Sequence, residues 1–317
     1  MKKILLISLT SIVTLLILFV GITVYREQRA DYGWDPSLSK QTYTTTHPRV
    51  VIDQAHNNAH TAGIAGRFWP FARLARADGY DVQKGTEKFS SQYLNSVDIL
   101  VIVNASGAPK PQVLGINFPM GTSGDRGAPA FTLDEIQALA NWVGQGGSLL
   151  LVADHAPFGA ASEELAAAFG VKMYKGFVEI PDELSDPLLF SKSNNRLGQH
   201  PIIDGDGAET AVSNVVTFTG QSLEGQADAT ILLRLPENAV EYIHATPGQE
   251  GGELVPIEAG NAQALALTVG QGRVVILGEA AMLTSQVYEG KPFGMNSEGN
   301  DNKQFALNVL HWLSLIL

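Results

Sequence analysis

The feature that most constrains the fold is a pair of short, continuously apolar segments, Ile99–Asn104 (ILVIVN) and Ser148–Ala153 (SLLLVA). Strands that are apolar throughout must be covered on both faces, which is typical of parallel sheets in α/β proteins. Helical patterns surround them: residues 68–79 (FWPFARLARADG) have helical periodicity, and Thr132 with Glu135 forms a capping box that opens another helix. This alternation predicts a flavodoxin-like α/β domain with a mainly parallel sheet, helices on both faces, and the two apolar segments among its central strands.

The remaining elements fit around this centre. The sequence predicts further strands at 50–53, 80–83, 265–269 and 273–277, the last two joined in a hairpin across a Gly-Gln-Gly turn, and a terminal helix from residue 300. Residues 105–130 form a Gly- and Pro-rich loop, longer than a plain connection needs. The segment 178–260, rich in Pro, Gly and acids, is expected to form excursions and peripheral strands.

The N-terminus carries a second long apolar run. Residues 4–25 contain no charged side chain, and a helix of that length covers the apolar thickness of a bilayer, about 30 Å. The competing interpretation, a cleaved signal peptide, usually has a shorter apolar region and a small-x-small cleavage site, which residues 24–27 (VYRE) do not provide. We therefore expect a transmembrane anchor (1–25), a polar juxtamembrane linker (26–46) and an α/β domain (47–317). The short basic N-terminus favours a single-pass membrane protein whose body is extracytoplasmic, in the periplasm.

Composition excludes several classes of function. The chain has no cysteine, which rules out disulfides, thiolate metal ligands and a cysteine nucleophile. Its net charge is −11, so we expect no nucleic-acid partner, because such proteins rely on attraction to the phosphate backbone.

Polar residues follow several of the predicted strands, most densely in the stretch DQAHNNAH at residues 53–60. The carboxyl ends of parallel strands lie at one edge of a sheet, where open α/β sheets bind their ligands. We therefore expect the following side chains to converge there: Asp53, His56, Asn57, Asn58, His60, Asn104, Ser106, Asp154, His155 and Glu279.

Their chemistry allows a metal site. Imidazoles and carboxylates suit zinc or another divalent cation, and a metal-bound water would supply a hydrolytic nucleophile. In that hypothesis the ligands are His56, His60, Asp154 and His155, the catalytic base is Asp53 or Glu279, and the substrate is held by Asn57, Asn58 and Asn104. The alternative is that these residues are ordinary turn formers and helix caps, with no ligand.

One segment carries a family resemblance. Residues 131–150, FTLDEIQALANWVGQGGSLL, together with 272–286, GRVVILGEAAMLTSQ, resemble the glutamine-amidotransferase-like superfamily. The resemblance extends over about residues 48–317 and is strongest to a membrane-associated bacterial branch, akin to transporter-linked gliding-motility and intraflagellar-transport domains. It implies a flavodoxin-like fold. Active members place a cysteine after a central strand, whereas this chain has Asp154-His155 there, so cysteine-dependent glutamine hydrolysis is excluded.

Two functions remain open at this stage. The first is a metal-assisted hydrolase that acts on a polar cell-envelope substrate outside the cytoplasm. The second is a non-catalytic module that binds a polar small molecule, a glycan or a partner protein of a transport system. The two differ in whether the carboxyl edge holds a metal ion.

Overall fold

A computed structural model describes residues 28–64, 66–109, 112–113, 116–117, 124–181, 183, 187–245 and 252–317. The predicted anchor at residues 4–25 lies outside this part of the chain. Among the helices that are described, none has the length and apolar character needed to cross a membrane.

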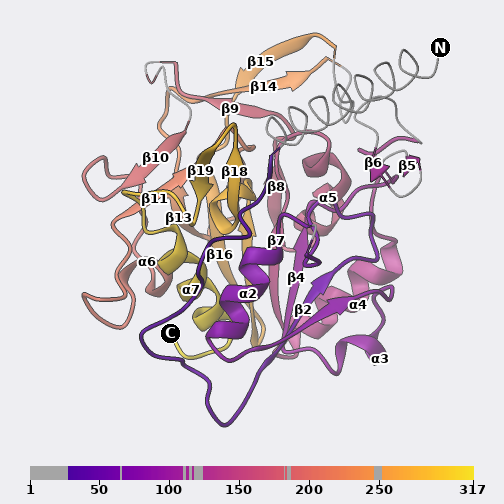
Figure 1. Cartoon of the computed structure of the whole chain (residues 1–317). Coiled ribbons are helices and arrows are strands. Elements are labelled where there is room, and N and C mark those ends of the chain that lie inside the picture. Colours follow the sequence, from indigo (N-terminus) through magenta and orange to yellow (C-terminus); the bar gives the residue numbers. More distant parts are fainter. Residues whose placement is uncertain are drawn as a thin grey trace, which may run out of the picture.

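A nine-stranded sheet forms the centre of the molecule (Figure 1). Five of its strands are parallel neighbours, and the others are antiparallel to the strands they pair with. The parallel strands, in spatial order, are β3 (Asp81–Gly85), β2 (Arg49–Asp53), β4 (Ile99–Val103), β7 (Ser148–Val152) and β17 (Gly272–Leu277). The antiparallel ones are β16 (Ala262–Val269), β12 (Leu223–Gly225), β8 (Val171–Met173) and β13 (Thr230–Arg234).

The two continuously apolar segments occupy the middle of this sheet, as predicted. Every residue of β4 and β7 is buried, and each strand pairs with a parallel neighbour on either side. The predicted hairpin is also present, as β16 and β17. The sheet as a whole is mixed and largely parallel: β16 of this hairpin runs antiparallel to its neighbours, and β12, β13 and β8 beyond it also pair antiparallel.

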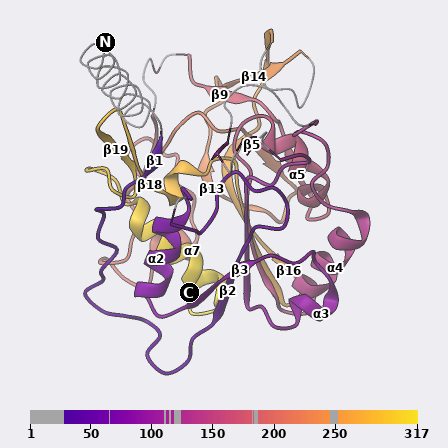
Figure 2. The same ribbon diagram turned by 45° about the vertical axis from the view of Figure 1, so that its right-hand side comes forward.

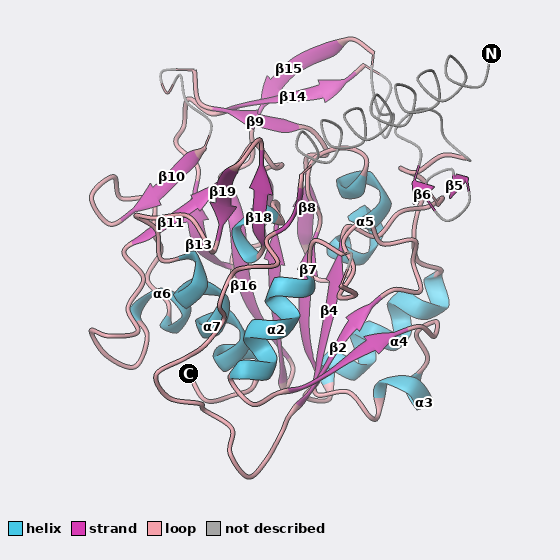
Figure 3. Ribbon diagram, in the orientation of Figure 1, coloured by secondary structure: helices cyan, strands magenta, loops and turns pink. Residues whose placement is uncertain are grey.

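Helices cover both faces of the sheet (Figures 2 and 3). Alternate residues of the central strands belong to two separate hydrophobic clusters, which gives each face its own core. One face packs on α2 (Trp69–Ala77), α6 (Pro201–Asp204) and α7 (Asn302–Leu313), and the other on α3 (Ser91–Leu94), α4 (Leu133–Gly144) and α5 (Phe158–Ala167). Because helices cover the sheet on both sides, both faces of the central strands are buried, as their continuous apolar sequence predicts.

Smaller elements surround the sheet. They are β1 (Arg29–Ala30) with β18 (Ser285–Tyr288) and β19 (Lys291–Gly294); β5 (Gln112–Val113) with β6 (Ile116–Asn117); β10 (Leu188–Ser191) with β11 (Asn214–Thr217); β9 (Phe177–Glu179) with β14 (Val240–His244) and β15 (Leu254–Glu258); and the 3-10 turn η1 (Ala281–Leu283). Most of the 178–260 strands are peripheral, as expected, although β12 and β13 join the main sheet.

The segment predicted as a juxtamembrane linker packs on the body over its described part. Arg29 and Ala30 pair with β18, and the aromatic rings of Trp34 and Tyr43 lie against the core. Asp78 accepts a hydrogen bond from the Thr42 amide and contacts His311 of α7 at 2.7 Å. Residues 28–46 are therefore a docked segment rather than an extended tether.

Candidate site at the carboxyl edge of the sheet

The DQAHNNAH loop leaves β2 and is fastened to the segment that follows β4. Two backbone hydrogen bonds join them, from the Ala59 amide to the Asn104 carbonyl and from the Ser106 amide to the His56 carbonyl, both at 2.9 Å. Asn58 adds a third connection, because its amide group donates to the Val103 carbonyl at 3.1 Å and its oxygen accepts from the His56 amide. The two strand ends therefore form one unit, as the topology predicts.

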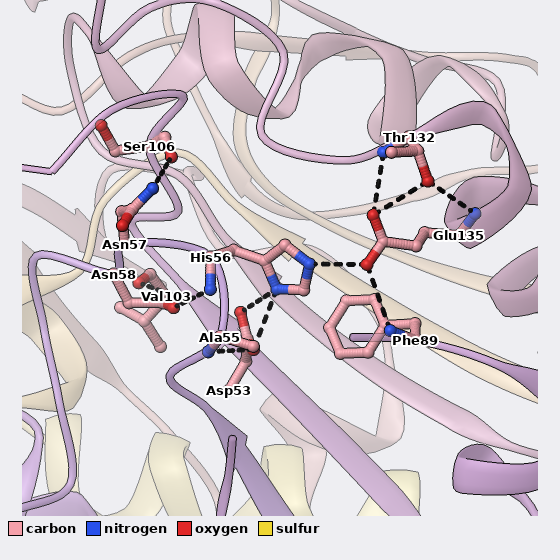
Figure 4. Close-up of polar contacts among 10 residues, drawn as sticks. All are labelled: Asp53, Ala55, His56, Asn57, Asn58, Phe89, Val103, Ser106, Thr132 and Glu135. Atoms are coloured by element: carbon pink, nitrogen blue, oxygen red, sulfur yellow. Dashed lines mark hydrogen bonds and ion pairs between the residues drawn. The ribbon is translucent and has the colours of Figure 1, made fainter. Parts of the chain in front are cut away.

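His56 lies at the centre of a buried cluster of charges (Figure 4). Its Nδ1 is 2.9 Å from Asp53 Oδ2, and its Nε2 is 2.9 Å from Glu135 Oε1, from the first turn of α4. The rings of Phe89 and Phe131 pack beside the imidazole, with centroids 4.5 and 4.7 Å away. All three charged residues are almost completely buried.

This geometry fixes the role of His56. Both ring nitrogens can donate hydrogen bonds only when the imidazole is protonated, so an imidazolium between two carboxylates satisfies every partner. Glu135 is itself held in place, because its other oxygen accepts from Thr132 in the predicted capping box. Burial alone raises the pKa of Glu135, but the hydrogen bonds from Thr132 and His56 outweigh it and lower the pKa to about 2. The cluster ties β2 to α4, and it leaves His56 no nitrogen for a metal ion.

Asn104 organises the second part of the edge. It adopts a left-handed backbone conformation, with φ of 49°, which asparagine tolerates better than most residues. Its side-chain oxygen accepts from the Asp154 amide at 2.9 Å, which fixes the orientation of the amide group. Its nitrogen therefore faces His60 Nδ1, at 2.8 Å. Because an amide nitrogen only donates, His60 must accept at Nδ1 and carry its proton on Nε2.

Glu279 follows β17 and lies behind this group. Its carboxylate accepts hydrogen bonds from the amides of Ala281 and Met282, and its side chain is fully enclosed. Burial, followed by the negative charge of Asp154, raises the pKa of Glu279 to about 8. Asp154 and Glu279 therefore lie close enough for the charge of one to disfavour ionisation of the other. Their proximity agrees with the predicted convergence of strand ends.

His155 has contacts of its own, with the turn after β7 and with β9. Its Nδ1 lies 2.8 Å from the Ala156 carbonyl, and its ring stacks on Phe177 of β9 with centroids 4.6 Å apart. Since a carbonyl only accepts, Nδ1 carries a proton, and in the neutral ring Nε2 then presents a lone pair. Phe177 also contacts His244, edge to face.

The predicted ligands thus divide among three neighbourhoods. In the part of the chain that the structure describes, no three side chains from His, Cys, Asp and Glu gather in a way that could hold a metal ion. His56 uses both nitrogens, and His60 Nδ1 accepts from Asn104, so these two imidazoles bond inside the protein instead of sharing an ion with Asp154 and His155. Asp53 is fully buried and bonded to His56, surroundings that suit a structural anion better than a catalytic base.

Four of the predicted residues reach the surface, and one of them, the half-buried Asn58, uses its side chain to hold the loop. Asn57 is exposed, with one weak hydrogen bond at 3.4 Å from its side-chain nitrogen to the Ser106 carbonyl, while Asp154 and His155 are half-buried. Sequence reasoning missed Gln221, which is fully buried and donates to the carbonyls of Ala153 and Asp154. It holds the turn after β7 from a distant segment, and no local pattern in the sequence marks it.

Comparison with known proteins identifies the type of fold. No protein-family model matches the chain, and neither does any curated protein sequence. Among solved structures, the mmIFT52 N-terminal domain matches with a TM-score of 0.55 and 14% identity, over 84% of this chain and 97% of that one. The fold is glutamine-amidotransferase-like.

Two further structures with this fold were found at lower scores. Cytoplasmic protein STM3548 from Salmonella typhimurium gives a TM-score of 0.49 at 14% identity, over 84% of this chain and 98% of that one. A ThuA-like protein from Bacteroides uniformis gives 0.45 at 12% identity, over 89% and 95%. In the amidotransferase-like fold described here, Asp154 and His155 follow the central strand β7, where the sequence resemblance places the cysteine of active members.

Proposed function

We propose that this chain is a non-catalytic binding module that holds a polar ligand or a partner at the carboxyl edge of its sheet. The observation that carries the proposal is that the buried members of the predicted site already have partners inside the protein. Asp53, His56, His60, Asn104 and Glu279 bond to one another, to Glu135 or to the backbone. His56, His60 and Asn104 shape the edge from behind, and Asn57, Asp154 and His155 face outward.

The chemistry of the outward-facing groups indicates the ligand class. The carboxylate of Asp154 and the Nε2 lone pair of His155 are acceptors, and Asn57 offers an amide. A ligand with hydrogen-bond donors, such as an amine or several hydroxyl groups, complements this set. The net charge of −11 acts in the same direction, because it repels anions.

Metal analysis separates this module from the metal-assisted hydrolase. The full chain, purified in detergent, is equilibrated with one equivalent of zinc and passed over a desalting column before its metal content is measured. We expect well under one zinc per chain, with the same value for His155→Ala. Stoichiometric zinc that disappears in both His155→Ala and Asp154→Asn would restore the hydrolase and defeat the binding module.

A thermal-shift screen then tests binding itself. The full chain is screened against amine- and hydroxyl-bearing small molecules and peptides. Any stabilising compound should lose its effect in Asp154→Asn and keep it in Gln137→Ala, an exposed position on α4 that bonds only within its own helix among the described contacts. A screen whose stabilising compounds act equally on both variants would contradict a site at Asp154.

We further propose that residues 4–25 anchor the module in the membrane with residues 28–317 on the extracytoplasmic side, where a transport system would be its partner. The support is the span-length apolar run and the lack of a cleavage site. Protease added to intact spheroplasts should digest the body. A protected body, or a mature N-terminus near residues 26–30, would contradict this topology.

A further inference from the structure

A groove lies at the opposite edge of the sheet, where the parallel strands begin. Its volume is about 570 Å³, within the range of small-molecule sites. Pro48, Asp98 and Ser148 line it, and they stand immediately before or at the start of β2, β4 and β7. The C-terminal end of α4 supplies Trp142 and Gln145. None of the residues assigned to the carboxyl edge lines this groove.

Several polar side chains of the groove have hydrogen-bonding capacity that the protein does not use. Within the described part of the chain, the side-chain amides of Asn95 and Gln145 have no hydrogen-bond partner, and both residues are exposed. Asp98 uses one carboxylate oxygen to accept from the Arg49 amide, which leaves the other. His47 donates from Nδ1 to the Gly79 carbonyl at 2.6 Å, so in the neutral ring its Nε2 is an acceptor.

Trp142 gives the groove a flat apolar wall. Its indole ring lies directly on the backbone of Gly147, where an added Cβ would fall 2.2 Å from ring carbon Cε2. No side chain other than hydrogen at position 147 allows this placement. Glycine at position 147 therefore allows the indole ring to lie against the backbone at the floor of the groove.

The charge of the lining selects against anions. No lysine or arginine is among the described residues that line the groove, and Asp98 contributes a negative charge. A phosphate or carboxylate ligand would lack a counter-charge. An aromatic wall flanked by amides, a carboxylate and an imidazole instead suits a ligand with an apolar face and a rim of hydroxyl groups.

We infer that this groove is a second binding site, for a neutral sugar unit that stacks on Trp142 and hydrogen-bonds to Asn95, Asp98 and Gln145. The site is independent of the proposed function at the carboxyl edge, because the two share no residue. It would allow the module to hold a glycan on the face opposite its first ligand.

The test uses three neutral trisaccharides as probes: maltotriose, cellotriose and triacetylchitotriose. Binding of each to the full chain in detergent is measured by saturation-transfer NMR and titration calorimetry. The variants are Trp142→Ala, Gly147→Ala, which should displace the indole while leaving every hydrogen-bonding group in place, and Gln137→Ala as the matched control on the same helix. Circular dichroism melts confirm that each variant is folded.

We expect at least one probe to bind the unmodified chain, Trp142→Ala and Gly147→Ala each to weaken that binding about tenfold or more, and Gln137→Ala to leave it unchanged. Three results would overturn the inference: no probe binds at about 10 mM, where even millimolar affinity is detected; Trp142→Ala binds as tightly as the unmodified chain; or binding is lost in Asp154→Asn but kept in Trp142→Ala, which would locate the sugar at the carboxyl edge.

Discussion

His56 and His60 lie four positions apart on one loop, yet their imidazoles have opposite surroundings. His56 turns toward α4 and is locked between two buried carboxylates, whereas His60 turns toward Asn104 and stands behind the half-buried Asp154. The difference shows that the residue type at a strand end does not decide its role. What decides it is which partner takes its ring nitrogens inside the protein. Both histidines are buried and bonded and belong to the scaffold, whereas the exposed Asn57 and the half-buried Asp154 and His155 are the candidate ligand contacts.

The largest expected effect concerns the scaffold side. His56→Ala should destabilise the protein by about 3–5 kcal/mol, because it leaves Asp53 and Glu135 buried without their shared cation. His155→Ala, on the open side, should cost about 1 kcal/mol or less. Urea denaturation of both variants, with a check that the slope is unchanged, measures the difference. Equal losses would erase the distinction between the two sides.

The next largest loss of stability should come from substitution of Asn104, because this residue has a left-handed backbone conformation and its side chain makes two hydrogen bonds. Asn104→Ala should cost about 2–4 kcal/mol, from the left-handed φ and from leaving His60 and the Asp154 amide without their partner. Asn104→Gly removes the same hydrogen bonds but tolerates the backbone, so it should be about 1 kcal/mol less damaging. Glycine no better than alanine would show that the backbone conformation carries no cost.

The two buried glutamates should respond to pH with opposite signs. The folded pKa of Glu135 is about 2, below the ordinary value of 4.5, so its contribution is present above pH 4.5 and is lost as the pH falls toward 2. The folded pKa of Glu279 is about 8, above 4.5, so the folded state retains a proton that the unfolded state releases. Its contribution is therefore present below pH 4.5 and is lost as the pH rises toward 8.

Glutamine variants separate the contributions of Glu135 and Glu279 to the pH dependence of stability. Relative to the unmodified protein, Glu135→Gln should lack the acid loss between pH 4.5 and 2, and Glu279→Gln should lack the loss between pH 4.5 and 8. Unfolding free energies measured across both windows provide the comparison. Parallel curves for Glu279→Gln and the unmodified protein would show that burial and Asp154 do not hold the proton on Glu279.

The sequence predicted the architecture well because its signals are local. Continuous apolarity placed β4 and β7 in the centre, and the Thr132–Glu135 capping box began α4 where the structure begins it. The convergence of strand ends also followed from topology. The sequence could not predict which polar residues of the carboxyl edge are bonded inside the protein and which face outward. That difference depends on contacts between distant segments: Glu135 lies 79 positions from His56, and Gln221 lies 67 from Asp154. A capping glutamate has a second carboxylate oxygen, and nothing in its neighbourhood says which side chain will take it.

The smallest expected effect distinguishes two adjacent asparagines that the sequence treats alike. Asn58 uses both ends of its amide group, toward the His56 amide and the Val103 carbonyl, so Asn58→Ala should cost about 1–2 kcal/mol. Asn57 is exposed, has φ of 50° and makes one long contact, so Asn57→Gly preserves its backbone and should change stability by about 0.5 kcal/mol or less. Denaturation of the two variants under identical conditions gives the comparison. If Asn57→Gly proved as costly as Asn58→Ala, Asn57 would belong to the scaffold, and the outward face of the edge would reduce to Asp154 and His155.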